Sequence, residues 1–254
     1  MSPLARSLMG RFAAPVAVVS GSGLAVVPHG YTAADEVSYA ELGWPESATA
    51  GHPNRLILAR RSAAPAGGPP AERVLLAWGR AHRYEGWNTG RLQAAVRGLA
   101  ELGVWRMVVT NAAGALRPGV GVGDVVVVEH VVDLQEAPAE RPPVLQATAP
   151  ALAQRAVATL ASSMRVRRGD YVAVAGPQYE TPAETRWLSG WGSVVGMSAT
   201  AEVRAAAELG LRLVVLAFVA NVAAAVGGHD EVVAAGAAFG LAADRGLAAL
   251  LSVI

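Results

Sequence analysis

Two short stretches of the chain carry side chains that could bind an anion and a planar ring. The first reads YVAVAGPQYETPAE and places Tyr179 next to Glu180. An aromatic face stacks on a nucleobase, and the adjacent carboxylate accepts hydrogen bonds from ring N–H groups. The second reads VVGMSATAE and places Met197 and Ser198 just after a glycine. Both stretches predict a strand that ends where a helix begins, which is where open α/β sheets bind ligands.

Further polar residues follow other predicted strands. Ser22 stands between two glycines whose N–H groups are open to an anion, and Ala112, near a predicted helix start, could offer its own N–H. Arg80 would add a planar fork that matches phosphate oxygens, and Ser198 a hydroxyl. Asn221 can donate to a ring nitrogen. Together these groups predict a site for phosphate or a phosphate ester beside a nucleobase.

These residues need a sheet to bring them together, and apolar runs alternating with helical patterns predict an α/β fold. The predicted strands are residues 16–20, 55–60, 74–78, 106–110, 125–128, 171–175, 193–195 and 213–220. The predicted helices are residues 92–102, 150–162, 182–188, 199–209 and 231–252. Thr181 as N-cap, Pro182 at the first helical position and Glu184 in a capping box mark one helix start, and Ser198 could cap another.

Composition excludes several classes of chemistry. All 21 basic residues are arginines, which rules out Schiff-base lysines and a P-loop lysine. The absence of cysteine rules out disulfides and thiolate metal sites. A formal charge of +1 gives no long-range attraction to nucleic acid or an anionic membrane. The apolar run 213–226 is shorter than the roughly 20 residues a membrane span needs, so we expect a cytoplasmic protein.

Five segments, in order along the chain, resemble the purine nucleoside phosphorylases of the trimeric class. They are GRAHRYEG (79–86), VTNAAGAL (109–116), AGPQYETPAE (175–184), VGMS (195–198) and HDEVVAAG (229–236). The resemblance implies a single α/β domain over residues 1–254, with a mixed, partly barrel-like sheet flanked by helices. It also implies phosphorolysis of 6-oxopurine nucleosides such as inosine and guanosine to free base and (deoxy)ribose 1-phosphate. Phosphate would be the co-substrate, with no metal or organic cofactor, and the assembly a homotrimer.

The resemblance also implies a role for individual residues. Phosphate would be held by Ser22, Arg80, His82, the Ala112 backbone and Ser198, with His52 on a mobile loop closing over it. Tyr84 and the Met197 backbone would hold the ribose hydroxyls, and His229 the 5′-hydroxyl. Tyr179 would face the base, Glu180 would accept from N1–H, and Asn221 would bond N7. Asn221, Glu180 and His82 would be the catalytic residues.

Some residues also have plainer interpretations. His52 could equally be a surface histidine, and Met197, at a strand end, would usually be core. Glu85 is expected to brace its loop, and Glu202 to lie on a helix face or an interface.

The chain departs from the family pattern in four places. Threonines usual beside the base-binding asparagine and after Met-Ser are replaced by Ala220 and Ala199, and Gly-Gly is replaced by Gly114-Ala115. The segment after Leu134 is short. No residue from 135 to 149 matches the family aromatic that reaches the neighbouring subunit.

Three alternatives remain open. A phosphorylase of methylthioadenosine or adenosine would want an acid or hydroxyl in place of Asn221, so Asn221 with Glu180 favours 6-oxopurines. A serine hydrolase could use Ser198 with His229 and Asp230, although the final glycine of a nucleophile elbow is missing. A purine-binding protein without activity is the third.

Overall fold

The computed structural model describes residues 3–21, 24–62, 72–136, 141–224 and 229–254. Its strands are β1 (Val16–Ser20), β2 (Tyr31–Ser38), β3 (Arg55–Arg61), β4 (Arg73–Trp78), β5 (Arg106–Ala115), β6 (Asp124–Asp133), β7 (Val144–Gln146), β8 (Arg165–Ala173), β9 (Val194–Gly196) and β10 (Arg212–Val222). Its helices are α1 (Pro3–Phe12), α2 (Tyr39–Leu42), α3 (Thr89–Leu92), α4 (Ala94–Glu101), α5 (Pro150–Leu160), α6 (Pro182–Leu188), α7 (Thr200–Glu208) and α8 (His229–Leu251), with a 3₁₀ turn at Arg83–Glu85.

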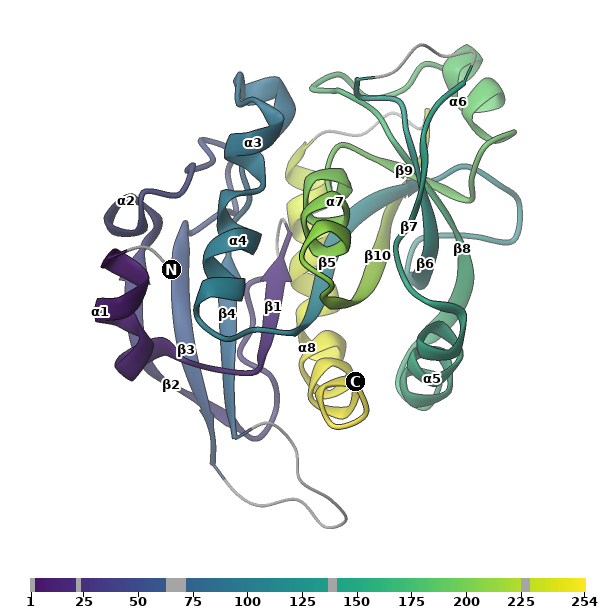
Figure 1. Cartoon of the computed structure of the whole chain (residues 1–254). Coiled ribbons are helices and arrows are strands. Elements are labelled where there is room, and N and C mark those ends of the chain that lie inside the picture. Colours follow the sequence, from purple (N-terminus) through teal and green to yellow (C-terminus); the bar gives the residue numbers. More distant parts are fainter. Residues whose placement is uncertain (1–2, 22–23, 63–71, 137–140, 225–228) are drawn as a thin grey trace.

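The strands form one mixed sheet that closes on itself over part of its width. The order is β10-β6-β8-β9-β5-β1-β4-β3-β2, and β10 also pairs with β5. Five strands therefore close into a barrel (β5, β10, β6, β8 and β9), while β1, β4, β3 and β2 continue from β5 as an open wing (Figure 1). The pairs include antiparallel β10–β6 and parallel β6–β8. The expected mixed, partly barrel-like α/β fold is confirmed.

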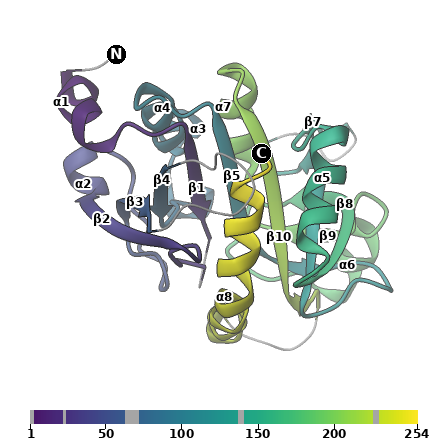
Figure 2. The same ribbon diagram turned by 90° about the horizontal axis from the view of Figure 1, so that it is seen from below.

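Helices cover both faces of the sheet, so its central strands β1, β4 and β10 are buried on both sides. In β1, Ala17 and Val19 pack in the apolar cluster that includes helices α4 and α7. Val16 and Val18 point the other way, into the cluster that includes α5 and α8. Helix α8 lies along β10 (Figure 2). This two-sided burial explains why the strands read as continuous apolar runs rather than alternating ones.

Every predicted strand and helix overlaps one in the structure, but several elements were not predicted. Helix α1 precedes the first predicted strand, and α2, β2 and β7 have no counterpart among the expectations. Strands β5 and β10 both run further than predicted, to Ala115 and Val222. The low-complexity stretch 63–71 reads AAPAGGPPA, a composition that predicts a hairpin or surface loop, and it lies outside the described residues. In the described part of the chain, no helix has the length and apolarity needed to cross a membrane.

Candidate active site

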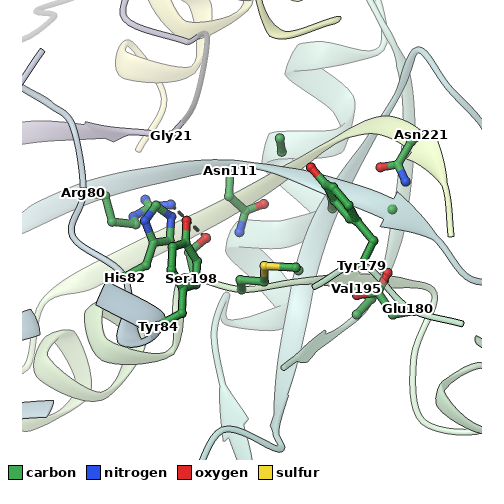
Figure 3. Close-up of a pocket in the computed structure, with 15 residues that line it drawn as sticks. Gly21, Arg80, His82, Tyr84, Asn111, Tyr179, Glu180, Val195, Ser198 and Asn221 are labelled. Carbon is green, nitrogen blue, oxygen red and sulfur yellow. Dashed lines mark hydrogen bonds between the residues drawn. The ribbon is translucent and has the colours of Figure 1, made fainter. Parts of the chain in front are cut away.

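One pocket gathers polar side chains from distant parts of the chain, at the ends of barrel and wing strands. It is lined by Gly21, Arg80, His82, Tyr84, Asn111, Ala112, Ala113, Gly114, Tyr179, Glu180, Val195, Gly196, Met197, Ser198 and Asn221. Figure 3 shows Arg80, His82 and Ser198 on one side of it, the Arg80 end. Glu180 and Asn221 lie on the other side, the Asn221 end, with Tyr179 beside them.

A glycine turn after β4 brings Arg80 into the pocket. Gly79 has φ +114°, and a Cβ there would lie 2.8 Å from the amide nitrogen of Asn54, so a larger residue would strain the turn. The next amide, Arg80 N–H, donates to Nδ1 of His52 at 3.0 Å. His52 is buried and meets the edge of the His82 ring, so its interpretation as a surface histidine is wrong. His52 is not one of the described residues that line the pocket, but its bond to the Arg80 amide supports the pocket.

The Arg80 guanidinium is bonded at all three nitrogens. Nε donates to Oε1 of Glu202 at 2.5 Å, Nη1 to Oγ of Ser198 at 3.1 Å, and Nη2 to the carbonyl of Thr110 at 3.1 Å. The side chains of Arg80 and Glu202 are only 5% and 8% exposed. Charge-assisted bonds in such a setting fix the orientation of the guanidinium plane. Ser198 is therefore held beside a cation whose position does not depend on a ligand.

Glu85 braces the loop that carries His82 and Tyr84. Its Oε2 accepts from the His82 amide at 2.6 Å, and its Oε1 accepts from the Ala48 amide at 2.7 Å. Burial opposes ionisation of this carboxyl, but hydrogen bonds from His82, Ala48 and Ser47 lower the pKa of Glu85 to about 2. The His82 ring stacks on Tyr84 with centroids 4.8 Å apart. Glu85 thus fixes two pocket side chains from behind, as the sequence predicts.

The turn between β9 and α7 packs against a buried tyrosine. A Cβ on Gly196 would lie 2.3 Å from the Tyr171 hydroxyl, so only glycine allows this approach. The same hydroxyl accepts from the Ser198 amide at 3.2 Å, and burial raises the pKa of Tyr171 to about 12. Met197 contacts the neighbouring turn so closely that a Cβ on Gly176 would lie 2.4 Å from its sulfur. Met197 and Ser198 are both held by packing.

The Asn221 end has fewer internal bonds. Helix α6 begins with the predicted capping box, in which Thr181 and Glu184 each bond the other's amide. This places Tyr179 and Glu180 just before the helix, where Tyr179 is 39% exposed. Burial raises the pKa of Glu180 above its usual value. The Asn221 carboxamide donates only to the next carbonyl, at 3.3 Å, among the described residues.

Asn111 is a pocket residue for which the sequence analysis predicted no role. It lies within β5, is 1% exposed, and lines the pocket midway between the two ends in Figure 3. Neither its Nδ2 nor its Oδ1 has a hydrogen-bond partner among the described residues. A buried carboxamide without partners costs stability, so it is a candidate for contact with a bound molecule. The sequence places Asn111 directly after the predicted strand 106–110, but its lack of partners is visible only in the folded chain.

Comparison with known proteins identifies the family. The model of the Phosphorylase superfamily matches residues 79–254. The purine nucleoside phosphorylase of Mycobacterium tuberculosis is 37% identical over 234 residues, covering 88% of this chain and 83% of that protein. The Bos taurus purine nucleoside phosphorylase is 32% identical over 225 residues, covering 81% and 75%. The chain belongs to the purine nucleoside phosphorylase family. It is therefore an enzyme, a pentosyltransferase.

A solved structure of a relative has the same fold as this phosphorylase. The schistosoma purine nucleoside phosphorylase in complex with hypoxanthine superposes with a TM-score of 0.80. It is 25% identical, and the match covers 99% of this chain and 95% of that one. The barrel and wing described above are thus the family fold.

The phosphorylase pocket brings together most residues that the sequence singled out. Arg80, His82, Tyr84, Ala112, Tyr179, Glu180, Met197, Ser198 and Asn221 all line it. Ser22 lies outside the described residues, as does the side chain of His229, although α8 begins at that residue.

Two of the local predictions about this pocket were wrong. Ser198 does not cap α7, because Ala199 is the N-cap residue and the Ser198 hydroxyl accepts from Arg80 instead. Ala112 is not near a helix start, because β5 continues through it. Glu202, expected on a helix face or an interface, lies on the face of α7 that meets Arg80 and pairs with it.

Proposed function

We propose that this phosphorylase cleaves 6-oxopurine nucleosides, such as inosine and guanosine, with orthophosphate. The products are the free base and ribose or deoxyribose 1-phosphate. The observation that carries the proposal is a single pocket with Arg80 and Ser198 at one end and Glu180 and Asn221 at the other. The relative from schistosoma that is 25% identical binds hypoxanthine, a 6-oxopurine.

The Arg80 end suits the attacking phosphate. The fixed guanidinium and the Ser198 hydroxyl offer a charge and a hydrogen bond to an anion, and His82 lies beside them. As the glycosidic bond breaks, positive charge develops on the sugar, as in oxocarbenium-like glycoside cleavage. A phosphate below the sugar stabilises that charge and then forms the new bond to C1′. In the proposal Ser22 and the Ala112 backbone complete this subsite, and His52 supports it through its bond to the Arg80 amide.

The Asn221 end suits the departing purine. The leaving base takes up the electron pair of the glycosidic bond, so negative charge develops on its five-membered ring. In the proposal the Asn221 amide donates to N7 and Glu180 accepts from N1–H, while Tyr179 faces the base. These contacts strengthen as charge develops, which lowers the barrier more than it tightens substrate binding. Tyr84, Met197 and His229 would hold the sugar between the two ends.

A phosphorylase of adenosine or methylthioadenosine is the nearest alternative. A 6-amino base presents an acceptor at N1 and would face the acceptor Glu180, which disfavours it unless the carboxyl is protonated. Rates with inosine, guanosine, adenosine and methylthioadenosine, measured side by side, discriminate the two. Faster cleavage of either adenosine compound would overturn the 6-oxopurine assignment.

Serine hydrolysis finds less support. The Ser198 hydroxyl accepts from the Arg80 guanidinium, whereas a nucleophilic serine donates to a general base. Ester hydrolysis without phosphate, lost in Ser198→Ala, would rescue that alternative.

The deciding measurement is purine release from inosine with and without orthophosphate. We expect release only with phosphate, in step with the formation of ribose 1-phosphate. Release at equal rates without phosphate would mean hydrolysis. Tight purine binding with no release under either condition would mean a binding protein.

We also propose the assembly and location that the family resemblance implies, a cytoplasmic homotrimer. Sedimentation equilibrium of the 26.0 kDa chain tests the assembly, with a particle of about three chain masses expected. A monomer at working concentration would contradict it.

A further inference from the structure

One peptide unit lies at the boundary between the proposed sugar and phosphate subsites. Its carbonyl belongs to Met197 and its N–H to Ser198, so a single rigid plane connects the two residues. Any rotation of this plane moves the Met197 backbone and the Ser198 side chain together. The groups that hold the plane therefore set the relation between the two subsites.

Both polar atoms of this peptide are bonded to side chains. The Ser198 N–H donates to the Tyr171 hydroxyl at 3.2 Å. The Met197 carbonyl accepts from Nε2 of Gln135 at 3.2 Å. Tyr171 is fully buried, and its hydroxyl packs against Gly196. This packing holds the hydroxyl in place. Gln135 is the other half of the clamp, and it comes from a different part of the chain.

The segment after β6 is well placed to fix Gln135. The Nε2 of Gln135 also donates to the Val174 carbonyl at 3.1 Å, so the carboxamide connects the turns that follow β8 and β9. Its own amide donates to Oδ1 of Asp133 at 2.9 Å. Asp133 is fully buried, and its other oxygen accepts from Arg204 of α7 at 2.6 Å. A chain of bonds thus runs from α7 through Asp133 and Gln135 to the pocket.

We infer that Gln135 is a positioning residue: with Tyr171 it clamps the Met197–Ser198 peptide and so fixes the spacing between the sugar and phosphate subsites. The inference rests on the proposed function for the names of those subsites, but the clamp itself rests on the bonds described above. It also gives a role to the start of the short segment 135–149, in which the sequence offered no match to the family aromatic.

The chain supplies a matched control. Gln146 also donates from Nε2 to two backbone carbonyls, those of Glu129 at 3.1 Å and Thr148 at 2.9 Å. Gln146 does not line the pocket. Gln135→Met and Gln146→Met therefore each remove two bonds from a side-chain amide to backbone carbonyls, and each keeps a side chain of similar length.

Kinetics on the whole enzyme should separate the two variants. We expect Gln135→Met to raise KM for phosphate and for inosine together and to lower kcat/KM about tenfold, on the order of one to two hydrogen bonds. Gln146→Met should lower the melting temperature without changing either KM. Equal melting shifts with unchanged kinetics in both variants would overturn the inference. A rise in KM for only one substrate would also overturn it.

A second measurement is independent of activity. Hydrogen exchange at the Ser198 amide should accelerate in Gln135→Met and in Tyr171→Phe, relative to Gln146→Met. The double variant should show less than the sum of the single effects, because both side chains hold one peptide. Unchanged exchange at Ser198 would reject the clamp even if the enzyme cleaves inosine. Faster exchange with no phosphorolysis in the wild type would reject the proposed function and leave the clamp standing.

Discussion

The two ends of the pocket are built by opposite strategies. At the Arg80 end the protein supplies its own partners: the guanidinium is bonded to Glu202, Ser198 and the Thr110 carbonyl, and its side chain is 5% exposed. At the Asn221 end the carboxamide has only a 3.3 Å contact with the next carbonyl among the described residues. A charge must be held in place before an anion arrives, because burying it without partners is costly. The neutral amide of Asn221 needs no such partner before the ligand binds.

The largest expected effect is on folding, at the Arg80 end. Glu202→Ala leaves the Arg80 charge buried without its ion-pair partner, which should lower the free energy of unfolding by about 3–5 kcal/mol. Glu208→Ala is the control, because Glu208 lies on the same helix and pairs with Arg97 at an exposed site. That change should cost at most about 1 kcal/mol. Denaturant unfolding measures both free energies. Similar losses would show that the buried pair contributes no more to stability than the exposed pair does.

The next effect is on catalysis, at the Asn221 end. Asn221→Ala should reduce kcat about 10²–10³-fold, because a donor aimed at developing charge is lost. KM for inosine should change much less, and stability should stay near that of the wild type. Steady-state kinetics with denaturant unfolding checks the prediction. An unchanged kcat would remove Asn221 from the mechanism, and a large loss of stability would make the two ends alike.

The pH dependence of kcat/KM for inosine should reflect the ionisation of the Glu180 carboxyl. Burial raises the pKa of this carboxyl, so its ionised fraction falls at a higher pH than for an exposed glutamate. Because the ionised form accepts from N1–H in our proposal, kcat/KM for inosine should fall on acidification. The midpoint should lie above the ordinary glutamate value of about 4.3. Glu180→Gln should abolish this acidic limb, and a variant that keeps it would assign the limb to another group.

The smallest effect concerns Glu85, behind the Arg80 end. Its pKa is lowered from 4.5 to about 2, so the folded state favours the ionised carboxyl. The resulting stability is present above pH 4.5 and is lost as the pH falls toward 2. Glu85→Gln should be less stable at neutral pH and should lose this part of the acid dependence. Unfolding free energies between pH 2 and pH 6 test it, and parallel curves for the two proteins would contradict it.

The sequence predicted what local signals specify. Thr181, Pro182 and Glu184 determine a helix start within four residues, and the structure has that capping box. The strand β2 was missed because most of its residues are exposed, so it has no apolar run to indicate it. The end of β5 was missed because small residues such as Gly114 continue the strand without a propensity signal. The end of β10 was missed because Asn221, a residue type depleted in strands, follows Ala220.

In the candidate site, the residues that the motifs name were predicted, as was the bracing role of Glu85 within its own motif, but the long-range partners were not. Glu202 meets Arg80 across 122 positions of sequence, and no local pattern indicates such a pair. The contacts of Gln135 were not predicted for the same reason, because its partners lie 39 and 62 positions away. Asn111 was passed over because its missing partners are visible only once the fold surrounds it.

Strand β5 is the barrel strand that carries the wing, and this arrangement sets how far apart the two ends of the pocket lie. Arg80 leaves the wing strand β4, whereas Asn221 lies on the barrel strand β10, and β1 and β10 flank β5 on its two sides. Among the described residues, the β1–β5 pair is the hydrogen-bonded connection between the wing and the barrel. The separation of Arg80 from Asn221 is therefore set by strand pairing and by the apolar residues of β1, none of which lines the pocket.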